Sequence, residues 1–371
     1  MINKESLTTR QSICIIVLFV FGSSAIVGGE YGAEQDSWIA VILAIVMAIP
    51  LTLMYARIMK LYPNNDLFDI SLKVFGNIAG RIIILLFVLY FILLSSLVLR
   101  NFSEFIQIGT LPETPQLAIL VLFVLVAAYI SSKGIQVLGK WCAVALPITA
   151  SIVGMTIIFC MPAMRLSYIQ PVFNTDIKTI FVVALKVLSF PFAEIVLFLP
   201  LASSVRKKDS PYKIYLLGLI FGGLMILASF LRNLLVLGAP HLKNSLFPSY
   251  SALRIVWIGT FLTRLDALIT SNFYLGGFSK ISACILASSI GVAKLFNVKD
   301  YKSTIIPICI IAVTVAIIIY RNVMEMFTSI TIYNYYSFFF QLILPAIIWV
   351  GAEIKNRKMK AGLNPENQQD S

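Results

Sequence analysis

The sequence Ser189-Phe190-Pro191-Phe192-Ala193-Glu194 interrupts an apolar run that extends from Ile177 to Ala202. A run of this length can cross the roughly 30 Å hydrocarbon layer of a membrane as an α-helix of about 20 residues. Proline removes a backbone donor and clashes with the preceding turn of a helix. The stretch therefore predicts a membrane-spanning helix that is broken near its middle and carries a carboxylate, Glu194, at the break.

Nine further apolar runs accompany this one, and together they predict an all-α integral membrane protein with ten spans. Of the 371 residues, 59% are hydrophobic and 12% are charged, whereas soluble domains carry about 25% charged residues. We expect one domain, residues 1–359, and a disordered cytoplasmic tail, residues 360–371. The predicted spans are 11–29, 38–59, 81–108, 116–131, 141–161, 177–202, 212–238, 259–286, 304–320 and 332–351.

The Lys and Arg residues of the connecting loops indicate the orientation. Nineteen of them, including Arg206, Lys207 and Lys208, fall on the side of the N-terminus, and five fall on the other side. Because loops rich in Lys and Arg remain in the cytoplasm, we expect both termini to be cytoplasmic in a bacterial cell membrane. The formal net charge of +12 then reflects topology and contact with anionic lipid, so it does not require nucleic acid as a partner.

A second predicted break, Gly22-Ser23-Ser24, lies in the first span. Spans one and six occupy equivalent positions in two halves of five spans, residues 10–161 and 177–355. Five is odd, so the halves enter the membrane in opposite directions, as in the inverted repeats of secondary transporters. Free N–H groups near Ser24 and Ala25 would suit an anionic ligand group. The alternative is that the glycines serve packing and the proline makes an ordinary kink.

Several charged residues fall within the predicted spans, where they are costly and usually face a cavity or a partner. Arg100 and Glu104 are four residues apart and share a helix face, which predicts a structural ion pair or a gate. Lys186 and Glu194 flank the break in span six. Glu194 is our candidate functional carboxylate, although it could instead bond the loose backbone of the break.

The eighth span contributes three more charges. Arg264 and Asp266 are two residues apart and point to nearly opposite helix faces, so each needs another partner. Lys280 lies deeper in the same span. It could face a water-filled cavity and replace a bound cation, or it could reach toward the membrane surface.

The sequence shows no sign of catalytic chemistry. It contains no Walker loop, no zinc-binding HExxH and no nucleophile elbow. Its five cysteines and one histidine form no metal-binding pattern. We therefore expect no enzymatic activity, no metal and no cofactor.

The chain resembles the B subunits of bacterial endospore germinant receptors, which belong to the amino acid–polyamine–organocation transporter superfamily. The resemblance covers nearly the whole chain, and its most specific part is the string from Phe190 to Pro200. Asp266 departs from the longer Glu that is usual there. The resemblance rests on residues 7–11, Gly22-Ser23, residues 36–39, Arg100 with Glu104, residues 190–200 and residues 261–266.

This resemblance implies a LeuT-type fold with interrupted helices one and six, and a ligand bound between spans one, three, six and eight. It also implies a small germinant (an amino acid or a nucleoside), an A-type membrane subunit and a C-type lipoprotein as partners, and residence in the spore inner membrane. A proton- or cation-coupled amino acid transporter remains the alternative. The expected ligand-binding residues are Gly22, Ser23, Ser24, Ala25, Leu94, Ser95, Phe190, Phe192, Ala193, Glu194 and Ser279.

Overall fold

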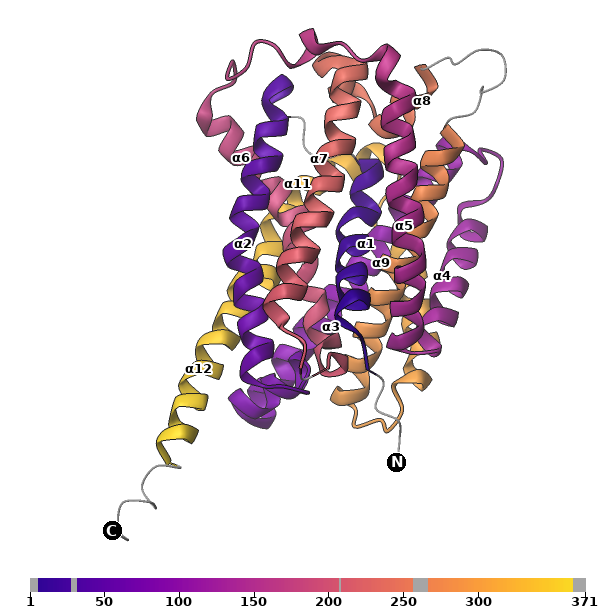
Figure 1. Cartoon of the computed structure of the whole chain (residues 1–371). Coiled ribbons are helices and arrows are strands. Elements are labelled where there is room, and N and C mark those ends of the chain that lie inside the picture. The colour runs from indigo at the N-terminus through magenta and orange to yellow at the C-terminus, as the bar shows by residue number, and fades with distance from the viewer. Residues whose placement is uncertain (1–5, 28–31, 207, 256–265, 363–371) are drawn as a thin grey trace.

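The computed structural model describes residues 6–27, 32–206, 208–255 and 266–362, and within these ranges the chain is almost entirely helical. The long helices lie side by side in one bundle (Figure 1). α1 begins and α12 ends at the same end of the bundle, which we call the terminal face. The main helices are α1 (Thr9–Val27), α2 (Ser37–Leu61), α3 (Leu67–Gly109), α4 (Gln116–Ser132), α5 (Ile135–Cys160), α6 (Ile177–Val187), α7 (Pro211–Asn244), α8 (Pro248–Ile255), α9 (Asp266–Leu295), α10 (Ile305–Ile318), α11 (Val323–Phe338) and α12 (Leu344–Gly362).

The described helices correspond to the ten predicted spans. Eight helical stretches are long and apolar enough to cross a membrane, and two shorter apolar helices, Thr9–Gly22 and Gln116–Ser132, coincide with predicted spans one and four. Large apolar side chains such as Leu122, Ile158 and Ile310 are more than half exposed on the bundle surface, where lipid can cover them. The chain is therefore an all-α multi-pass membrane protein.

The predicted break in span six is confirmed. α6 ends at Val187, a π-helical turn (η4, Leu188–Phe192) follows, and a 3-10 helix (η5, Ala193–Ser204) completes the span. Phe190 has extended dihedral angles, φ −131° and ψ 113°, inside this turn. The break falls where Pro191 removes a backbone donor, as expected.

The predicted break at Gly22-Ser23-Ser24 is wrong, because α1 is helical from Thr9 through Val27. The Ser24 hydroxyl donates to the carbonyl of Val20 at 2.6 Å, a bond within the helix. Gly22 serves a close helix crossing instead. A Cβ added to it would lie 2.7 Å from the carbonyl oxygen of Gly276 in α9. Residues 28–31, which include Gly28-Gly29, lie outside the described ranges.

α1 occupies the interior of the bundle between α7 and α9. Gly218 and Gly222 of α7 face it, and a Cβ added at Gly218 would lie 2.5 Å from the side chain of Ile16. Small residues let membrane helices approach closely. This glycine pair therefore serves helix packing, and α1 is held on two sides by glycine crossings.

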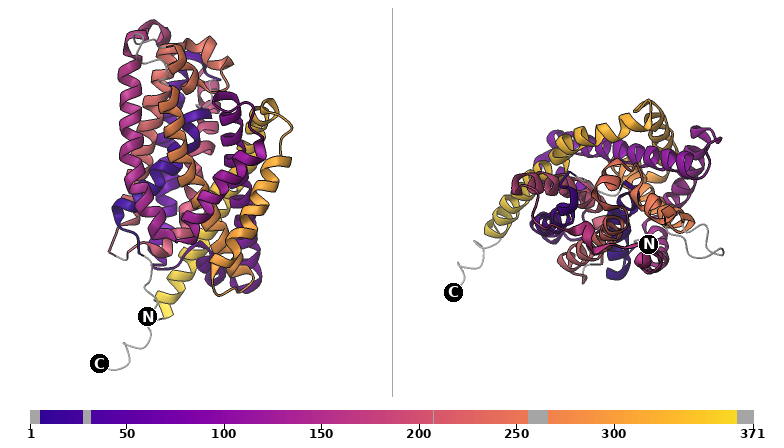
Figure 2. Two further views of the ribbon diagram at one scale, coloured as in Figure 1. Left: turned by 90° about the vertical axis from the view of Figure 1, so that its right-hand side faces the viewer. Right: turned by 90° about the horizontal axis from the view of Figure 1, so that it is seen from above.

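The terminal face is tied together by contacts between distant segments. The backbone N–H of Leu7 donates to the carbonyl of Ser204 at 2.7 Å, which links the segment before α1 to the end of η5. Lys294 at the end of α9 pairs with Asp66 at 2.6 Å and also with Asp69. Among the described helices, α12 extends beyond the bundle here (Figure 1, Figure 2).

We predict that Gly22→Ala destabilises the protein, because the added Cβ meets rigid backbone of α9 and not a flexible side chain. Overpacking of this kind costs about 1–3 kcal/mol. Thermal unfolding of the purified protein in detergent should show a lower midpoint. Gly154→Ala in α5 is the matched control, since a Cβ there meets nothing within 4 Å. Equal midpoints for the two variants would contradict the close crossing.

Candidate functional site

Glu194, the first acidic residue after the break, forms the centre of the candidate site. Its side chain and that of Lys280 in α9 are both fully buried, and Lys280 Nζ lies 2.5 Å from Glu194 Oε2. The Tyr333 hydroxyl in α11 donates to Glu194 Oε1, also at 2.5 Å. Both bonds run to side chains of other helices, so they do not support the alternative in which Glu194 serves the loose backbone of the break.

Lys280 lies between a carboxylate and two aromatic rings. Its Nζ is 4.9 Å from the ring centre of Phe19 in α1 and 5.0 Å from that of Phe190 at the break. Rings at this distance attract a cation through their negative faces. Lys280 is 0% exposed, which contradicts the alternative that it reaches toward the membrane surface.

Hydrogen bonds extend from Glu194 into the last span. Because Tyr333 donates to Glu194, its oxygen is free to accept from the Tyr90 hydroxyl, 3.1 Å away in α3. Gln341 Nε2 in turn donates to Tyr90 at 2.8 Å. The donors of this chain of hydrogen bonds therefore all point toward Glu194.

Gln341 also satisfies the backbone of the break. It lies in a second π-helical turn, η7 (Phe339–Ile343), and its Nε2 donates to the carbonyl of Ser189 at 3.0 Å. The Tyr55 hydroxyl donates to the carbonyls of Gln341 and, at 3.3 Å, of Ala193. Carbonyls that a helix break frees are thus bonded by side chains of α2 and the last span, as buried polar groups require.

A cavity of about 40 Å³ opens next to Glu194. At about 10–15 Å³ per water, it can hold roughly three water molecules. It extends from the break along α3 and α11 toward Tyr320, at the end of the bundle opposite the terminal face. The lining residues are Leu94, Leu97, Val98, Asn101, Phe190, Glu194, Tyr320, Met326, Ile330 and Tyr333.

The cavity brings together three of the expected ligand-binding residues, namely Leu94, Phe190 and Glu194. Its described lining comes from α3, the break and the α10–α11 region. No lining residue in the described ranges belongs to α1 or α9, so the cavity is displaced from the expected position between spans one, three, six and eight. α9 contributes Lys280, which approaches Glu194 from the other side.

Two other expected ligand-binding residues, Ser95 and Ser279, form hydrogen bonds within or between helices. Ser95 donates to the carbonyl of Ile92 within α3. Ser279 accepts from the Trp141 indole at 3.0 Å, which joins α9 to α5. Gly22, Ser24 and Ala193 are absent from the described cavity lining. The side chains of Ser23 and Ala25 lie outside the described residues.

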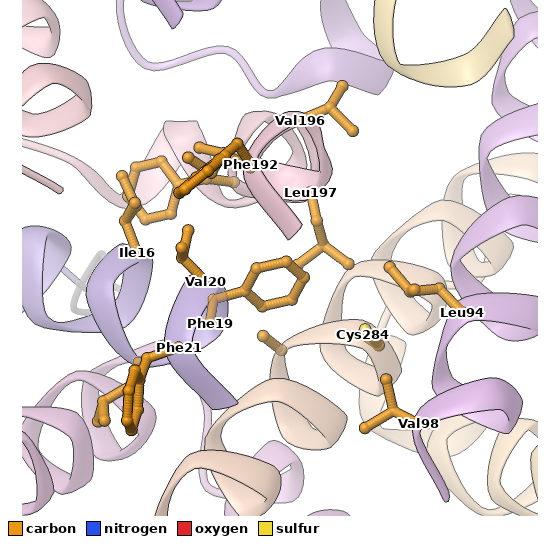
Figure 3. Close-up of a cluster of buried hydrophobic side chains, with 14 of the residues drawn as sticks. Ile16, Phe19, Val20, Phe21, Leu94, Val98, Phe192, Val196, Leu197 and Cys284 are labelled. Atoms are coloured by element: carbon orange, nitrogen blue, oxygen red, sulfur yellow. The ribbon is translucent and has the colours of Figure 1, made fainter. Parts of the chain in front are cut away.

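Phe192 points away from the cavity. Figure 3 shows it beside Ile16 and Val20 of α1, at some distance from Leu94 and Val98. It is 0% exposed, and its ring edge would lie 3.5 Å from a Cβ added at Gly223 of α7. The two aromatic residues of the break therefore differ, since Phe190 faces the cavity and Phe192 anchors η4 against α1 and α7.

The predicted pair of Arg100 and Glu104 is present, with Arg100 Nε 2.8 Å from Glu104 Oε1. Arg100 also donates to the carbonyls of Ala316 and Ile317 at 3.1 Å each. It thereby bonds the last carbonyls of α10, which are left open at a helix C-terminus. These contacts support the structural reading of the pair.

Of the remaining predicted charges, Lys186 is absent from the lining of the cavity. Lys186 is half-buried on α6, one turn before the break. Arg264 lies outside the described ranges, and Asp266 begins α9 but its side chain is not described. Within the described ranges, no group of three or more His, Cys, Asp or Glu is placed to hold a metal ion.

Sequence reasoning missed the contribution of the last span. Tyr333 and Gln341 bond the break, and Tyr90 of α3 joins them, yet none of the three is charged. A signal was present, because residues 333–341 carry two tyrosine hydroxyls besides Tyr333, a serine and a glutamine within an apolar run. Arg232 of α7 was also missed. It is 2% exposed and donates to Thr156 Oγ1 at 2.6 Å.

Known proteins resemble this chain in sequence and in fold. A family model described as "Spore germination protein" matches residues 6–340. Spore germination protein KB of Bacillus subtilis (strain 168) is 25% identical, over 98% of this chain and 99% of its own length.

Two solved transporter structures share the fold. MHP1, a nucleobase-cation-symport-1 family transporter with bromovinylhydantoin bound, has a TM-score of 0.68 at 12% identity and covers 89% of this chain and 75% of its own. MhsT in complex with L-phenylalanine has a TM-score of 0.65 at 13% identity, and the match covers 92% of this chain and 87% of MhsT. At such low identity the likeness establishes the fold alone, which is the LeuT-type transporter fold expected from the sequence.

We predict that Glu194→Gln strongly destabilises the protein, because it leaves the buried ammonium of Lys280 without its counter-charge. Breaking one partner of a buried pair costs about 3–5 kcal/mol. The double variant Glu194→Gln/Lys280→Met removes both charges and should regain much of the loss. The thermal unfolding midpoints of Glu194→Gln, of Lys280→Met and of the double variant test this coupling. Additive losses would show that the two side chains do not depend on each other.

Proposed function

The chain belongs to the spore germination protein family, and we propose that it is the nutrient-binding subunit of a germinant receptor. In this proposal a small nutrient, an amino acid or a nucleoside, enters the cavity beside Glu194 and triggers germination of the spore. The proposed ligand contacts are Leu94, Phe190 and Glu194 from the sequence analysis, with Asn101 and Tyr333 added by the geometry of the cavity.

The observation that carries the proposal is the position of the buried Glu194–Lys280 pair at the inner end of an accessible cavity. A carboxylate in an apolar pocket is a specific partner for a ligand ammonium, since an isolated charge there is costly. A ligand amine that enters the cavity competes with Lys280 for Glu194. An amino acid ligand would in addition leave its carboxylate near the amide of Asn101.

The small size of the cavity suggests how binding could become a signal. Space for about three waters is less than a nucleoside or a large amino acid needs, so the ligand would bind a conformation in which the cavity is wider. The equilibrium then shifts by the difference between the affinities of the ligand for the two conformations. We expect α11, which forms one wall of the cavity, to move when the cavity widens, because its Tyr333 is hydrogen-bonded to Glu194.

The cellular setting is also part of the proposal. The excess of Lys and Arg in the loops at the terminal face supports cytoplasmic termini in the spore inner membrane. An A-type membrane subunit and a C-type lipoprotein would form the receptor complex and convert the conformational change into exit from dormancy.

A coupled amino acid transporter is the second candidate. It is favoured by the transporter fold and by the buried carboxylate of Glu194 at the centre of the bundle, which could take up a proton or bind a cation if Lys280 moved away. Uptake of radiolabelled amino acids by vesicles that contain this chain alone distinguishes the candidates. Saturable uptake favours the transporter, and binding without uptake favours the receptor.

We expect Asn101→Leu to raise the nutrient concentration that gives half-maximal germination by tenfold or more. The substitution keeps the side-chain size but removes the amide, and a hydrogen bond to a charged group is worth about 1.5–3 kcal/mol, or roughly tenfold and above. Germination of spores that carry the variant in place of the natural chain measures the shift. Asn77→Leu, on the exposed part of α3 near the terminal face, is the matched control and should respond normally.

If Asn101→Leu spores respond normally to every nutrient while the protein is present at its usual level, the cavity does not bind the germinant. A scaffold role for the subunit would then be favoured, because such a role does not depend on the residues that line the cavity.

A further inference from the structure

A second cavity, of about 80 Å³, lies at the terminal face and is separate from the site at Glu194. It is formed where the last turn of α2, the α2–α3 loop, the end of η5 and the start of α7 meet. The lining residues are Met59, Lys60, Tyr62, Pro63, Asn64, Asn65, Ala202, Val205, Arg206, Asp209 and Pro211.

The lining of this cavity offers hydrogen-bond donors and positive charge. Lys60 and Arg206 are exposed cations at its rim. Tyr62 is only 8% exposed, and its buried hydroxyl has no hydrogen-bond partner in the part of the chain that the structure describes. Burial raises the pKa of Tyr62, so the hydroxyl keeps its proton and remains a donor. A buried donor without a partner is costly, which points to a group that is bound there.

The lining of this cavity also includes an acceptor, Asp209. Asp209 follows the basic residues of the same loop, yet its buried Oδ2 has no hydrogen-bond partner among the described residues. A carboxylate beside this cavity disfavours a simple anion such as inorganic phosphate. It favours a ligand that presents an anionic group to Lys60, Arg206 and the Tyr62 hydroxyl, and an N–H donor to Asp209.

We propose that this cavity binds a phosphoethanolamine group, that is, a phosphate ester joined through two carbons to a primary ammonium. The phosphate would accept from Tyr62, Lys60 and Arg206, and the ammonium would donate to Asp209. The size agrees, since 80 Å³ holds roughly five to eight waters, and the phosphate with its aminoethyl arm has a similar number of heavy atoms.

The position of the cavity points to the membrane surface as the source of this group. α2 ends at Leu61 and α7 begins at Pro211, so the cavity lies where spans leave the hydrocarbon layer and lipid headgroups begin. Exposed lysines at such a level attract lipid phosphate. A soluble phosphoethanolamine ester carries the same chemistry, and the experiment below distinguishes the two sources.

A bound headgroup would also contact the segment that closes the terminal face. Val205 lines the cavity and forms a parallel bridge with Leu7. A ligand held between the α2–α3 loop and the end of η5 therefore stabilises the closed arrangement of this face. This effect is independent of whether a nutrient binds at Glu194.

The test uses the purified chain in detergent and measures binding by native mass spectrometry and by the shift of the thermal unfolding midpoint. The added ligands are phosphatidylethanolamine, phosphatidylcholine, phosphatidylglycerol and soluble O-phosphoethanolamine. We expect phosphatidylethanolamine to bind at least tenfold more tightly than phosphatidylcholine, whose methylated nitrogen has no N–H to donate to Asp209. Stabilisation by O-phosphoethanolamine alone would identify a soluble ligand, and stabilisation by the lipid alone would identify the headgroup.

Variants assign the binding to this cavity. Tyr62→Phe keeps the ring and removes only the donor, and should weaken phosphatidylethanolamine binding about tenfold. Asp209→Asn should abolish the preference over phosphatidylcholine. Lys133→Ala is the matched control for Lys60→Ala. Each lysine lies over a tyrosine ring, with Nζ 5.4 Å from the ring centre for Lys133 and 5.3 Å for Lys60. Of the two, only Lys60 lines the cavity.

Three results would overturn the proposal. One is equal or tighter binding of phosphatidylglycerol, since this would indicate general attraction of an anionic lipid to basic loops. Another is unchanged phosphatidylethanolamine binding by Tyr62→Phe together with retention of the full preference over phosphatidylcholine by Asp209→Asn. The third is the absence of binding by any of the phosphoethanolamine ligands to the natural sequence, which needs no variant and does not depend on how the variants fold.

Discussion

The ion pair of Glu194 and Lys280 is the interaction on which the centre of the bundle depends. Both side chains are fully buried in a membrane protein, where an isolated charge is strongly disfavoured. The pair therefore fixes η5, which carries Glu194, against α9, which carries Lys280. Tyr333 adds α11 to the same point, so three helices that are distant in sequence meet at one carboxylate.

The broken helix is possible because other helices supply what its backbone lacks. The carbonyl of Ser189 at the break accepts from Gln341, and the carbonyl of Ala193 at the start of η5 accepts from Tyr55. The second π-helical turn, which carries Gln341, is hydrogen-bonded to the first through the carbonyl of Ser189. Single π-helical turns of this kind often occur at functional sites. The polar contacts that make the break stable are thus the same contacts that connect Glu194 to the last span.

The sequence allowed the fold and one end of the site to be predicted, because both depend on local patterns. Span length follows from apolar runs, and the break at Phe190 follows from a proline that cannot continue a helix. Glycine is ambiguous by comparison. Gly22 could equally mark a break or a close crossing, and the deciding partner, Gly276, lies in another helix.

The partners of Glu194 could not be predicted for a similar reason. Lys280 was a candidate because it is charged, but its pairing depends on how α9 packs against the break. Tyr333 gave a weaker signal, since tyrosine in a membrane span commonly serves packing or the interface. The position of the cavity, on the α11 side of Glu194 and away from α1, follows from these packing contacts.

The same limit explains Asp36, whose carboxylate accepts from the backbone N–H groups of Phe173 and Thr175. A motif that contributed to the family resemblance therefore holds a loop in place.

The placement of η5 connects the two ends of the molecule. Glu194 lies near its start, and Ser204, at its end, accepts the backbone hydrogen bond of Leu7 at the terminal face. η5 is short and buried along most of its length, and closely packed elements move as units and do not deform continuously. A shift of Glu194 away from Lys280 would therefore be transmitted along η5 to the Leu7–Ser204 contact. In the receptor that we propose, this path is a direct physical route from an occupied cavity to a change at the cytoplasmic surface, where partner subunits could detect it.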